Sequence, residues 1–320
     1  MHQGGDETQR ALGAATIAVV FWGIGPLMVR GIDASAATIV FWRFALAQPV
    51  MIGASYYFGK GLSLRLIRRA LLPGALFAVS MLAAFTSFQK TSIVNASLIQ
   101  AMQPALLLVV APFVFKKRTT LRQFAFGGVA LLGVATLVLG GGSTEGSALS
   151  GDLWAAFNLV LWTVYFVLVQ RIRQDGEDAT SILAAVFFVS FVVATPITLG
   201  MAGSVGEIVN IGWKGYLLEV LMVLGPGLVG HGMMMWSQRH LDIRVASLMG
   251  LGSPVLSTLG AWMIYSQSLG FLQLIGGVIV LIGLTGIMLE HRGNRARPAV
   301  SPTLPAAEPD LSEAQGRLIS

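Results

Sequence analysis

The chain of 320 residues is 55% hydrophobic and only 11% charged. Soluble domains are roughly a quarter charged and cannot bury this much apolar surface, so the composition excludes a water-soluble protein. A membrane span takes about 20 residues, so the length allows at most about a dozen spans and no large soluble catalytic domain beside them. Because there is no cysteine, disulfides, thiolate metal sites and a cysteine nucleophile are also excluded.

Ten apolar runs follow one another along the chain, and each is long enough to cross a bilayer as a helix. The first run lacks a convincing signal-peptide cleavage site, so we expect it to remain as a span. The runs cover residues 12–29, 34–58, 70–88, 92–115, 124–142, 153–169, 180–201, 215–236, 245–266 and 269–289. This pattern predicts an all-α membrane protein with ten transmembrane helices.

The positive charges predict the orientation. If the amino terminus is cytoplasmic, 17 Lys and Arg residues fall in inside segments and 3 in outside loops, and Arg43 lies within a span. Inside loops of membrane proteins carry this excess, so we expect both termini in the cytoplasm. The amino-terminal tail would be residues 1–10. Residues 291–320 are rich in Pro, Ala, Ser and Glu, which predicts a disordered cytoplasmic tail.

The two halves of the chain resemble each other. At an offset of 150 residues Pro104 aligns with Pro254, and at a slightly shorter offset Trp22 aligns with Trp162. The repeats would be residues 11–142 and 153–290, joined by a periplasmic linker at 143–152. Since each repeat has five spans, an odd number, the second must be inverted relative to the first. Many secondary transporters are built from inverted repeats with a binding site near the midplane.

Short segments carry a family resemblance. They are WGIGP in the first run, FWRF in the second, NASLIQAMQPALLLVVAPFVF in the fourth, GDLWAAFNLVLWTVYFVLVQR in the sixth, and VASLMGLGSPVLSTLGAWMI and LQLIGGVIVLIGLTGIM in the last two. In this order they resemble EamA-type carriers of the drug/metabolite transporter superfamily, and among these the bacterial exporters of aromatic and other amino acids. The resemblance covers residues 11–289. It implies two inverted five-helix repeats around a central cavity in the bacterial inner membrane. The usual family carboxylates after the fourth and ninth spans are replaced by Lys117 and Gln267.

Arg43 is the one charge that the sequence places well inside a span. An arginine at a span centre costs roughly 2.5 to 3.5 kcal/mol, so it should face protein, water or a partner. It either binds a substrate carboxylate through its planar guanidinium or ties spans together, for example through Glu219 near the outer end of the eighth run. We expect no acidic residue deep in any span, which favours a facilitator or weakly coupled exporter of neutral or zwitterionic metabolites over a carrier of lipophilic cations.

Other polar and aromatic residues are candidates for lining the cavity. Gln100 and Gln103 share one arc of an ideal helix with Asn95, and amides there either bind substrate or join helices. Trp22 and Trp162, with Tyr165, would form aromatic walls or simply pack. His231 would bind substrate or serve as a hydrogen-bonded structural residue.

Glycines predict close helix packing at two kinds of place. The stretch GPGLVGHG, residues 225–232, should bend or unwind the eighth span, or let another helix approach closely. Two shorter motifs, GGVALLG and GGVIVLIG, should permit close packing of the fifth and tenth spans. Their glycines are Gly127, Gly128, Gly133, Gly276, Gly277 and Gly283.

The most favoured function is export of small metabolites, foremost aromatic and other amino acids, by alternating access. A drug or nucleotide-sugar carrier of the same superfamily and a polar-lined channel remain alternatives. The chain has no HExxH, DDxxD or aspartyl pair that a membrane enzyme would need, so we expect no catalysis, no cofactor and no metal. The expected partners are a small-molecule substrate and the lipid bilayer, without nucleic acid. The oligomeric state stays open, and a monomer is compatible with the pattern.

Overall fold

The computed structural model describes residues 3–103, 105–106, 121–141, 148–240, 249–250, 252–267 and 270–295, and all regular structure within them is helical. The helices follow the apolar runs because only helices satisfy their own backbone in lipid. They are α1 (Gln3–Gly31), α2 (Ala36–Phe58), α3 (Leu64–Lys90), α4 (Ile93–Gln100), α6 (Leu121–Gly141), α7 (Leu149–Gln174), α8 (Ala179–Met201), α9 (Val205–Val209), α10 (Gly212–Met222), the π-helix η1 (Val223–Gly230), α11 (His231–His240), α13 (Gly252–Tyr265) and α14 (Phe271–Arg295).

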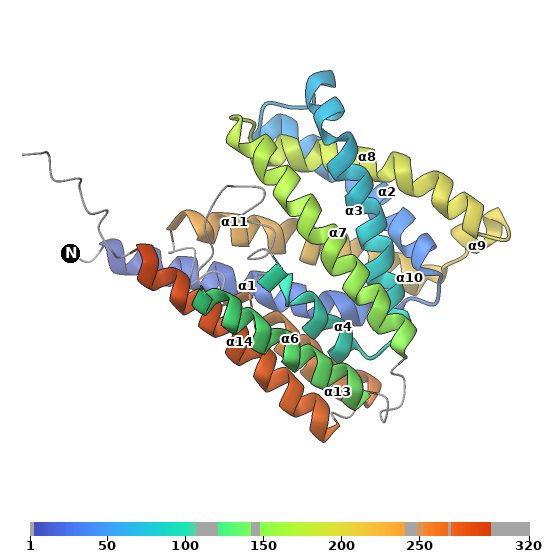
Figure 1. Ribbon diagram of the computed structural model, residues 1–320. Coiled ribbons are helices and arrows are strands. Elements are labelled where there is room, and N and C mark those ends of the chain that lie inside the picture. Colours follow the sequence, from blue (N-terminus) through green and yellow to red (C-terminus); the bar gives the residue numbers. More distant parts are fainter. Residues whose placement is uncertain are drawn as a thin grey trace, which may run out of the picture.

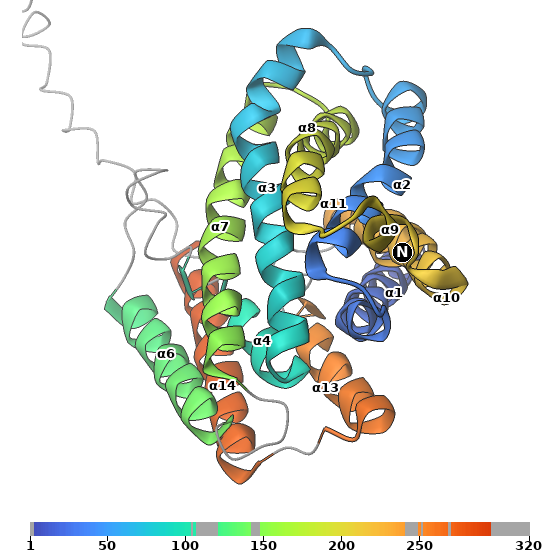
Figure 2. The same ribbon diagram turned by 90° about the vertical axis from the view of Figure 1, so that its right-hand side faces the viewer.

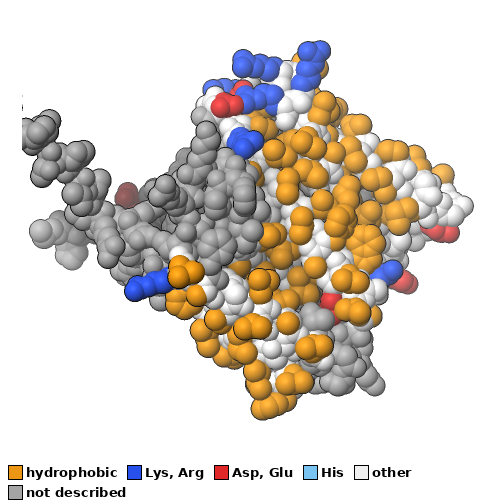
Figure 3. Space-filling model, in the orientation of Figure 1, with side chains coloured by type: hydrophobic (Ala, Val, Ile, Leu, Met, Phe, Trp, Pro, Cys, Tyr) orange, Lys and Arg blue, Asp and Glu red, His pale blue; other side chains and the backbone are white. Residues whose placement is uncertain are grey.

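In the described residues, six helical segments are long and apolar enough to cross a membrane, and two shorter segments, Ala125–Thr136 and Phe271–Gly286, are also apolar. Apolar side chains cover much of the face in Figure 3, whereas Lys and Arg gather at its upper edge. The protein is therefore a multi-pass membrane protein. The full set of ten crossings stays a prediction.

Helix ends differ by a few residues from the predicted segment bounds, and the division into segments stays a prediction. The helix α1 already begins at Gln3, within the predicted tail 1–10. The linker expected at 143–152 is shorter, because α7 begins at Leu149. At the other end α14 continues to Arg295, so the first residues of the predicted disordered tail are helical. Pro104 and Lys117 lie outside the described residues.

The helices pack in pairs that join the two halves of the chain. In both views α3 lies along α7, and α6 lies beside α14 at one edge of the molecule (Figures 1 and 2). The helix α8 packs against α2 and α3, while α1 packs against α11, η1 and α13. The short α4 lies in the middle of the bundle, against α7 and α13.

Two glycines allow α6 and α14 to touch backbone to backbone. A Cβ on Gly133 would lie 2.6 Å from the backbone nitrogen of Val280, and one on Gly283 would lie 2.6 Å from that of Ala130. The predicted role of these glycines in close packing is confirmed. It is wrong for Gly127 and Gly128, which have nothing within 4 Å.

Gly133→Ala is expected to destabilise the protein by about 1 to 3 kcal/mol, because the new methyl group meets rigid backbone. Gly128→Ala is the matched control five residues earlier on α6, and it should leave stability unchanged or slightly raised. Thermal unfolding in detergent, followed by tryptophan fluorescence, measures both. Equal stability of the two variants would contradict the backbone contact.

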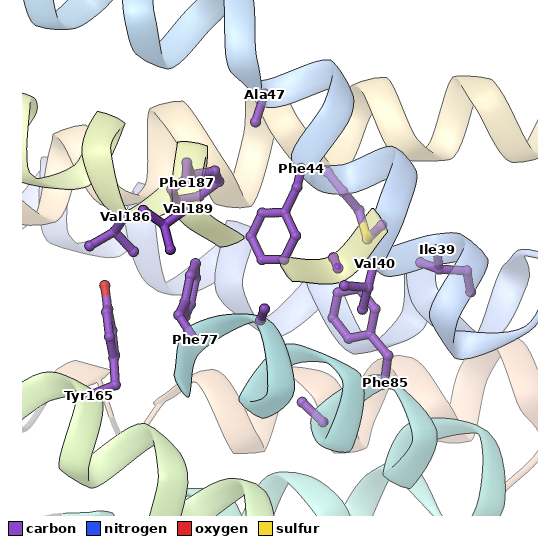
Figure 4. Packing of buried hydrophobic residues seen from close by; sticks show 14 of the residues in the cluster. Ile39, Val40, Phe44, Ala47, Phe77, Phe85, Tyr165, Val186, Phe187 and Val189 are labelled. Carbon is purple, nitrogen blue, oxygen red and sulfur yellow. The ribbon is translucent and has the colours of Figure 1, made fainter. Parts of the chain in front are cut away.

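The largest core cluster lies between α2, α3, α7 and α8 and is centred on aromatic rings. Phe77 is 5.5 Å from both Phe44 and Phe187 between ring centroids, and it stacks on Tyr165 at 4.8 Å. Figure 4 shows Phe44, Phe77 and Phe187 converging from three helices, with Tyr165 beyond Phe77. Such rings contribute packing beyond the area they bury.

Asp178 joins the α7–α8 connection to the α2–α3 connection. Its carboxylate caps α8 by accepting the Ser181 N–H at 2.8 Å, and it also accepts the Lys60 N–H at 3.0 Å. Burial pushes the pKa of Asp178 upward, but these backbone hydrogen bonds and hydroxyl groups nearby outweigh it and lower the pKa. The carboxylate therefore stabilises the fold above its ordinary pKa, and this contribution is lost as the pH falls through the lowered value.

Asp178→Ala is expected to lower the free energy of unfolding by about 1 to 2 kcal/mol at neutral pH, as for other lost helix caps. The loss should shrink when the pH falls below the carboxylate's pKa, because the wild type then loses the same contribution. Asp178→Asn keeps a capping oxygen and is the control that removes only the pH dependence. The comparison is a set of unfolding curves over acidic to neutral pH. A pH-independent difference between wild type and Asp178→Ala would contradict this role.

Candidate functional site

Arg43 is buried in the bundle on α2, seven residues after the helix begins. Its side chain is 9% exposed, and the guanidinium lies 5.7 Å from the centre of the Phe85 ring on α3. The Nε atom has no hydrogen-bond partner. Within the part of the chain that the structure describes, Arg43 forms no ion pair. The idea that Arg43 ties spans together through a direct contact with Glu219 is therefore not supported.

Glu219 is fully buried on α10, with 0% exposure, and neither carboxylate oxygen has a hydrogen-bond partner among the described residues. The helix α10 packs against α1 and α2, and the charges of Glu219 and Arg43 interact electrostatically. The expectation of no acidic residue deep in a span is wrong. The helix begins at Gly212, before the apolar run, so Glu219 lies about 10 Å along it.

Trp22 and His231 contact each other where α1 packs against α11. Their ring centroids are 5.3 Å apart in an edge-on arrangement, and the Trp22 Nε1 has no hydrogen-bond partner. The His231 Nδ1 lies 2.8 Å from the Pro226 carbonyl oxygen. Because a carbonyl oxygen only accepts, Nδ1 carries the proton in this contact. His231 also lies within the electrostatic reach of Arg43.

The glycine-rich stretch changes the helix next to this site. Residues Val223–Gly230 form the π-helix η1, which contains Pro226. Proline has no N–H to continue the α-helical ladder, and π-helical turns are frequent at functional sites. A Cβ on Gly225 would lie 2.8 Å from the Phe21 ring, and one on Gly230 would lie 3.0 Å from the Trp22 Nε1. The predicted irregular helix and the close approach of a neighbour are both confirmed.

Trp162 and Tyr165 lie elsewhere, in the aromatic cluster around Phe77. The Trp162 ring centroid is 5.2 Å from that of Tyr165 and 5.6 Å from that of Phe77. Trp22 instead packs against a separate cluster formed by α1 and α11. The structure therefore does not bring the two equivalent tryptophans together, and the contacts of Trp162 and Tyr165 are those of packed core residues.

Gln100 and Gln103 do not continue one helix. The helix α4 ends at Gln100, and Ala101 and Met102 form a turn before Gln103. A common arc of Gln100 and Gln103 stays a prediction. Both side chains are half-buried, and the Gln100 Nε2 atom has no hydrogen-bond partner.

Asn95 belongs to a buried polar network that the sequence did not reveal. Its Nδ2 lies 3.2 Å from both carboxylate oxygens of Asp152 on α7, and its Oδ1 accepts a hydrogen bond from Gln273 on α14. The Thr91 hydroxyl also donates to Asp152, at 2.7 Å. Nearby, Gln267 accepts the Ile93 N–H at 3.1 Å. This network joins α4, α7 and α14.

We call Trp22, Arg43, Glu219 and His231 the charged site. It lies where α1, α2 and α10–α11 meet. Among the described residues, no group of three or more His, Asp or Glu side chains could hold a metal ion. A void of about 10 Å³ between α2, α3 and α8 is lined by apolar side chains and Thr198, and it is too small for a substrate. The expected central cavity therefore stays a prediction.

Comparisons with known proteins agree on a family. The model of the EamA-like transporter family matches the chain twice, at residues 9–139 and 149–289. Two uncharacterized transporters of Bacillus subtilis (strain 168) are each 25% identical. YcxC aligns over 68% of this chain and 73% of its own length, and YyaM over 78% and 83%. A solved crystal structure shares the fold, with a TM-score of 0.61 at 20% identity, and covers 88% of this chain and 98% of that one. The chain belongs to the EamA-like transporter family.

Proposed function

We propose that this membrane transporter exports small metabolites, foremost aromatic and other amino acids, across the bacterial inner membrane. The observation that carries the proposal is the buried guanidinium of Arg43, which forms no ion pair with any described residue. A planar guanidinium is well suited to bind a carboxylate through paired hydrogen bonds. Trp22 lies in the same charged site, next to His231, and offers an aromatic surface.

Alternating access by two inverted repeats is part of the proposal. Two matches to one family model support a repeat, and the helix pairs support a pseudo-twofold relation between the halves. The third helix of the first half, α3, packs on the first helix of the second half, α7. In the same way, the continuous α10–η1–α11 helix of the second half packs on α1 of the first. The helices α2 and α8 pack on each other, and so do α6 and α14. Rocking of one repeat against the other would open the charged site to each side in turn.

The proposed orientation has both termini in the cytoplasm. The α2–α3 connection carries Lys60, and the α7–α8 connection carries Asp175, Glu177 and Asp178. Arg69, in the second turn of α3, forms ion pairs with Asp175 and Glu177. Lys and Arg gather at that end of the molecule in Figure 3. A cytoplasmic location of this end satisfies the positive-inside rule.

The other candidate substrate-binding residues are proposed to have different roles. Gln100 has a buried amide without a partner and is proposed to face the transport path, with Gln103 following it. His231 is proposed to support Trp22 from its position on the π-helix. For Trp162 and Tyr165 the contacts favour a supporting role, in which they hold the helices behind the path.

The test is uptake of labelled amino acids, drugs and nucleotide sugars into proteoliposomes, with and without an imposed pH gradient. We expect saturable uptake and counterflow of amino acids, with aromatic ones foremost. Saturable uptake of drugs or nucleotide sugars alone would contradict amino acids as the substrates and support those compounds instead. Flux that does not saturate and shows no counterflow would indicate a channel.

A further inference from the structure

Glu219 and Arg43 are buried charges of opposite sign that belong to different halves of the chain. Arg43 lies within the first match to the family model and Glu219 within the second. Their charges interact, but no ion pair or hydrogen bond joins them. Both positions are therefore fixed by helix packing and not by a direct bond between the two side chains.

A buried carboxylate without partners is unfavourable on its own. Taking an ionised group out of water costs several kcal/mol unless hydrogen bonds and an opposite charge replace the lost hydration. Arg43 supplies an opposite charge at a distance, but both oxygens of Glu219 lack donors. The hydrogen-bond capacity of this carboxylate is left unused by the protein.

The neighbouring polar groups do not fill this role. His231 directs its Nδ1 proton to the Pro226 carbonyl oxygen, and the Trp22 N–H has no acceptor in the described part of the chain. Arg43 lies over the ring of Phe85 and makes no hydrogen bond through Nε. Two charged groups with unused hydrogen-bond capacity therefore remain in one buried region between α2 and α10.

We propose that Arg43 and Glu219 together form a binding site for a zwitterion, in which Glu219 holds the ammonium group and Arg43 the carboxylate. This inference rests on the proposed function and names the substrate class of the same site. A molecule with both charges satisfies both side chains through charge-assisted hydrogen bonds of about 2.8 Å. Neither partner of the pair is then left as an isolated charge inside the membrane.

The arrangement also predicts which molecules are rejected. A carboxylic acid without an amine leaves Glu219 unpaired and adds a second negative charge near it. An amine without a carboxylate leaves Arg43 unpaired and places two positive charges close together. Discrimination by unpaired buried charge is strong, because the penalty falls on the wrong ligand and not on the right one.

The experiment measures the affinity of phenylalanine relative to that of 3-phenylpropionate, which lacks the amine, by competition with phenylalanine uptake into proteoliposomes. We expect the wild type to prefer phenylalanine, and Glu219→Gln to reduce this preference by about 10- to 100-fold. Glu207→Gln, which removes a carboxylate from the exposed α9, is the matched control and should keep the wild-type preference. Glu219→Asp retains the charge and should keep most of the preference.

An unchanged preference in folded Glu219→Gln would overturn the zwitterion site while leaving amino-acid transport in place. If Glu219→Gln does not fold, ligand-induced thermal stabilisation of the wild type decides the question. Phenylalanine should then stabilise the protein more than either 3-phenylpropionate or phenethylamine, and equal shifts would overturn the proposal. Absence of uptake of any amino acid by the wild type would instead contradict the proposed function itself, and the zwitterion site with it.

Discussion

Arg43→Gln is expected to reduce transport of carboxylate-bearing substrates by about 10- to 100-fold, the loss that corresponds to one hydrogen-bonded charge. Glutamine keeps a polar side chain but is shorter and has no guanidinium, so the contact of Arg43 with the Phe85 ring is lost as well. The variant removes the planar fork that would hold a carboxylate, and it leaves Glu219 as the remaining charge of the pair. Arg43 would repel the ammonium group of an amine that lacks a carboxylate, so transport of such amines should not fall together with that of amino acids.

The matched control is Arg65→Gln, because Arg65 is exposed near the start of α3 and its loss removes one positive charge from the surface. It should leave both kinds of substrate unaffected. Initial rates of uptake into proteoliposomes, compared at equal amounts of folded protein, measure the effect. Equal losses for carboxylate-bearing and amine substrates in Arg43→Gln would show that Arg43 maintains the fold and does not bind substrate.

Much of the helical framework could be predicted from the sequence. Apolar runs set the positions of the helices, and serines or an aspartate before them set several starts. The side chains of Ser35, Ser63, Ser92 and Asp178 cap α2, α3, α4 and α8. The glycine- and proline-rich stretch also predicted an irregular helix, which the structure shows as η1. These features depend on residues that are close in sequence.

The charged site depends on neighbours that are distant in sequence. Hydropathy placed Glu219 near the end of its run, but its burial results from α1 and α2 packing over α10. The same holds for Asp152, which lies near the start of α7. It is buried, and it accepts hydrogen bonds from Thr91 and Asn95. An acidic residue near the end of an apolar run therefore cannot be assigned to solvent from hydropathy alone.

A turn interrupts the helix directly after Gln100. The predicted common face of Gln100 and Gln103 assumed 100° per residue, and it stays a prediction across this turn. The repeat alignment was similarly limited for the tryptophans. Trp22 and Trp162 align in the predicted repeat, but the first contacts His231 and the second contacts Phe77 and Tyr165. Two residues that align in a repeat have similar backbone positions, but the side chains around them can differ.

This difference predicts opposite consequences for two tryptophan substitutions. Trp162→Ala opens a cavity beside Phe77 and Tyr165, so the free energy of unfolding should fall by about 3 kcal/mol, with little change in selectivity among the substrates still transported. Trp22→Ala should cost less stability, because its ring has one aromatic neighbour, His231. It should reduce uptake of aromatic amino acids more than that of small ones. Trp213→Ala, at a site 78% exposed, controls for loss of an indole.

Thermal unfolding and competition between phenylalanine and alanine uptake separate the two effects in the same preparations. Trp22 lies in the charged site, so its removal changes the surface presented to a bound side chain, whereas Trp162 acts on the substrate only through the positions of α3 and α7. A selectivity change of equal size in both variants would restore the paired aromatic walls expected from the repeat. Unchanged selectivity in a stable Trp22→Ala protein would show that the Trp22 indole does not contact the substrate. Recognition would then depend on Arg43 and Glu219.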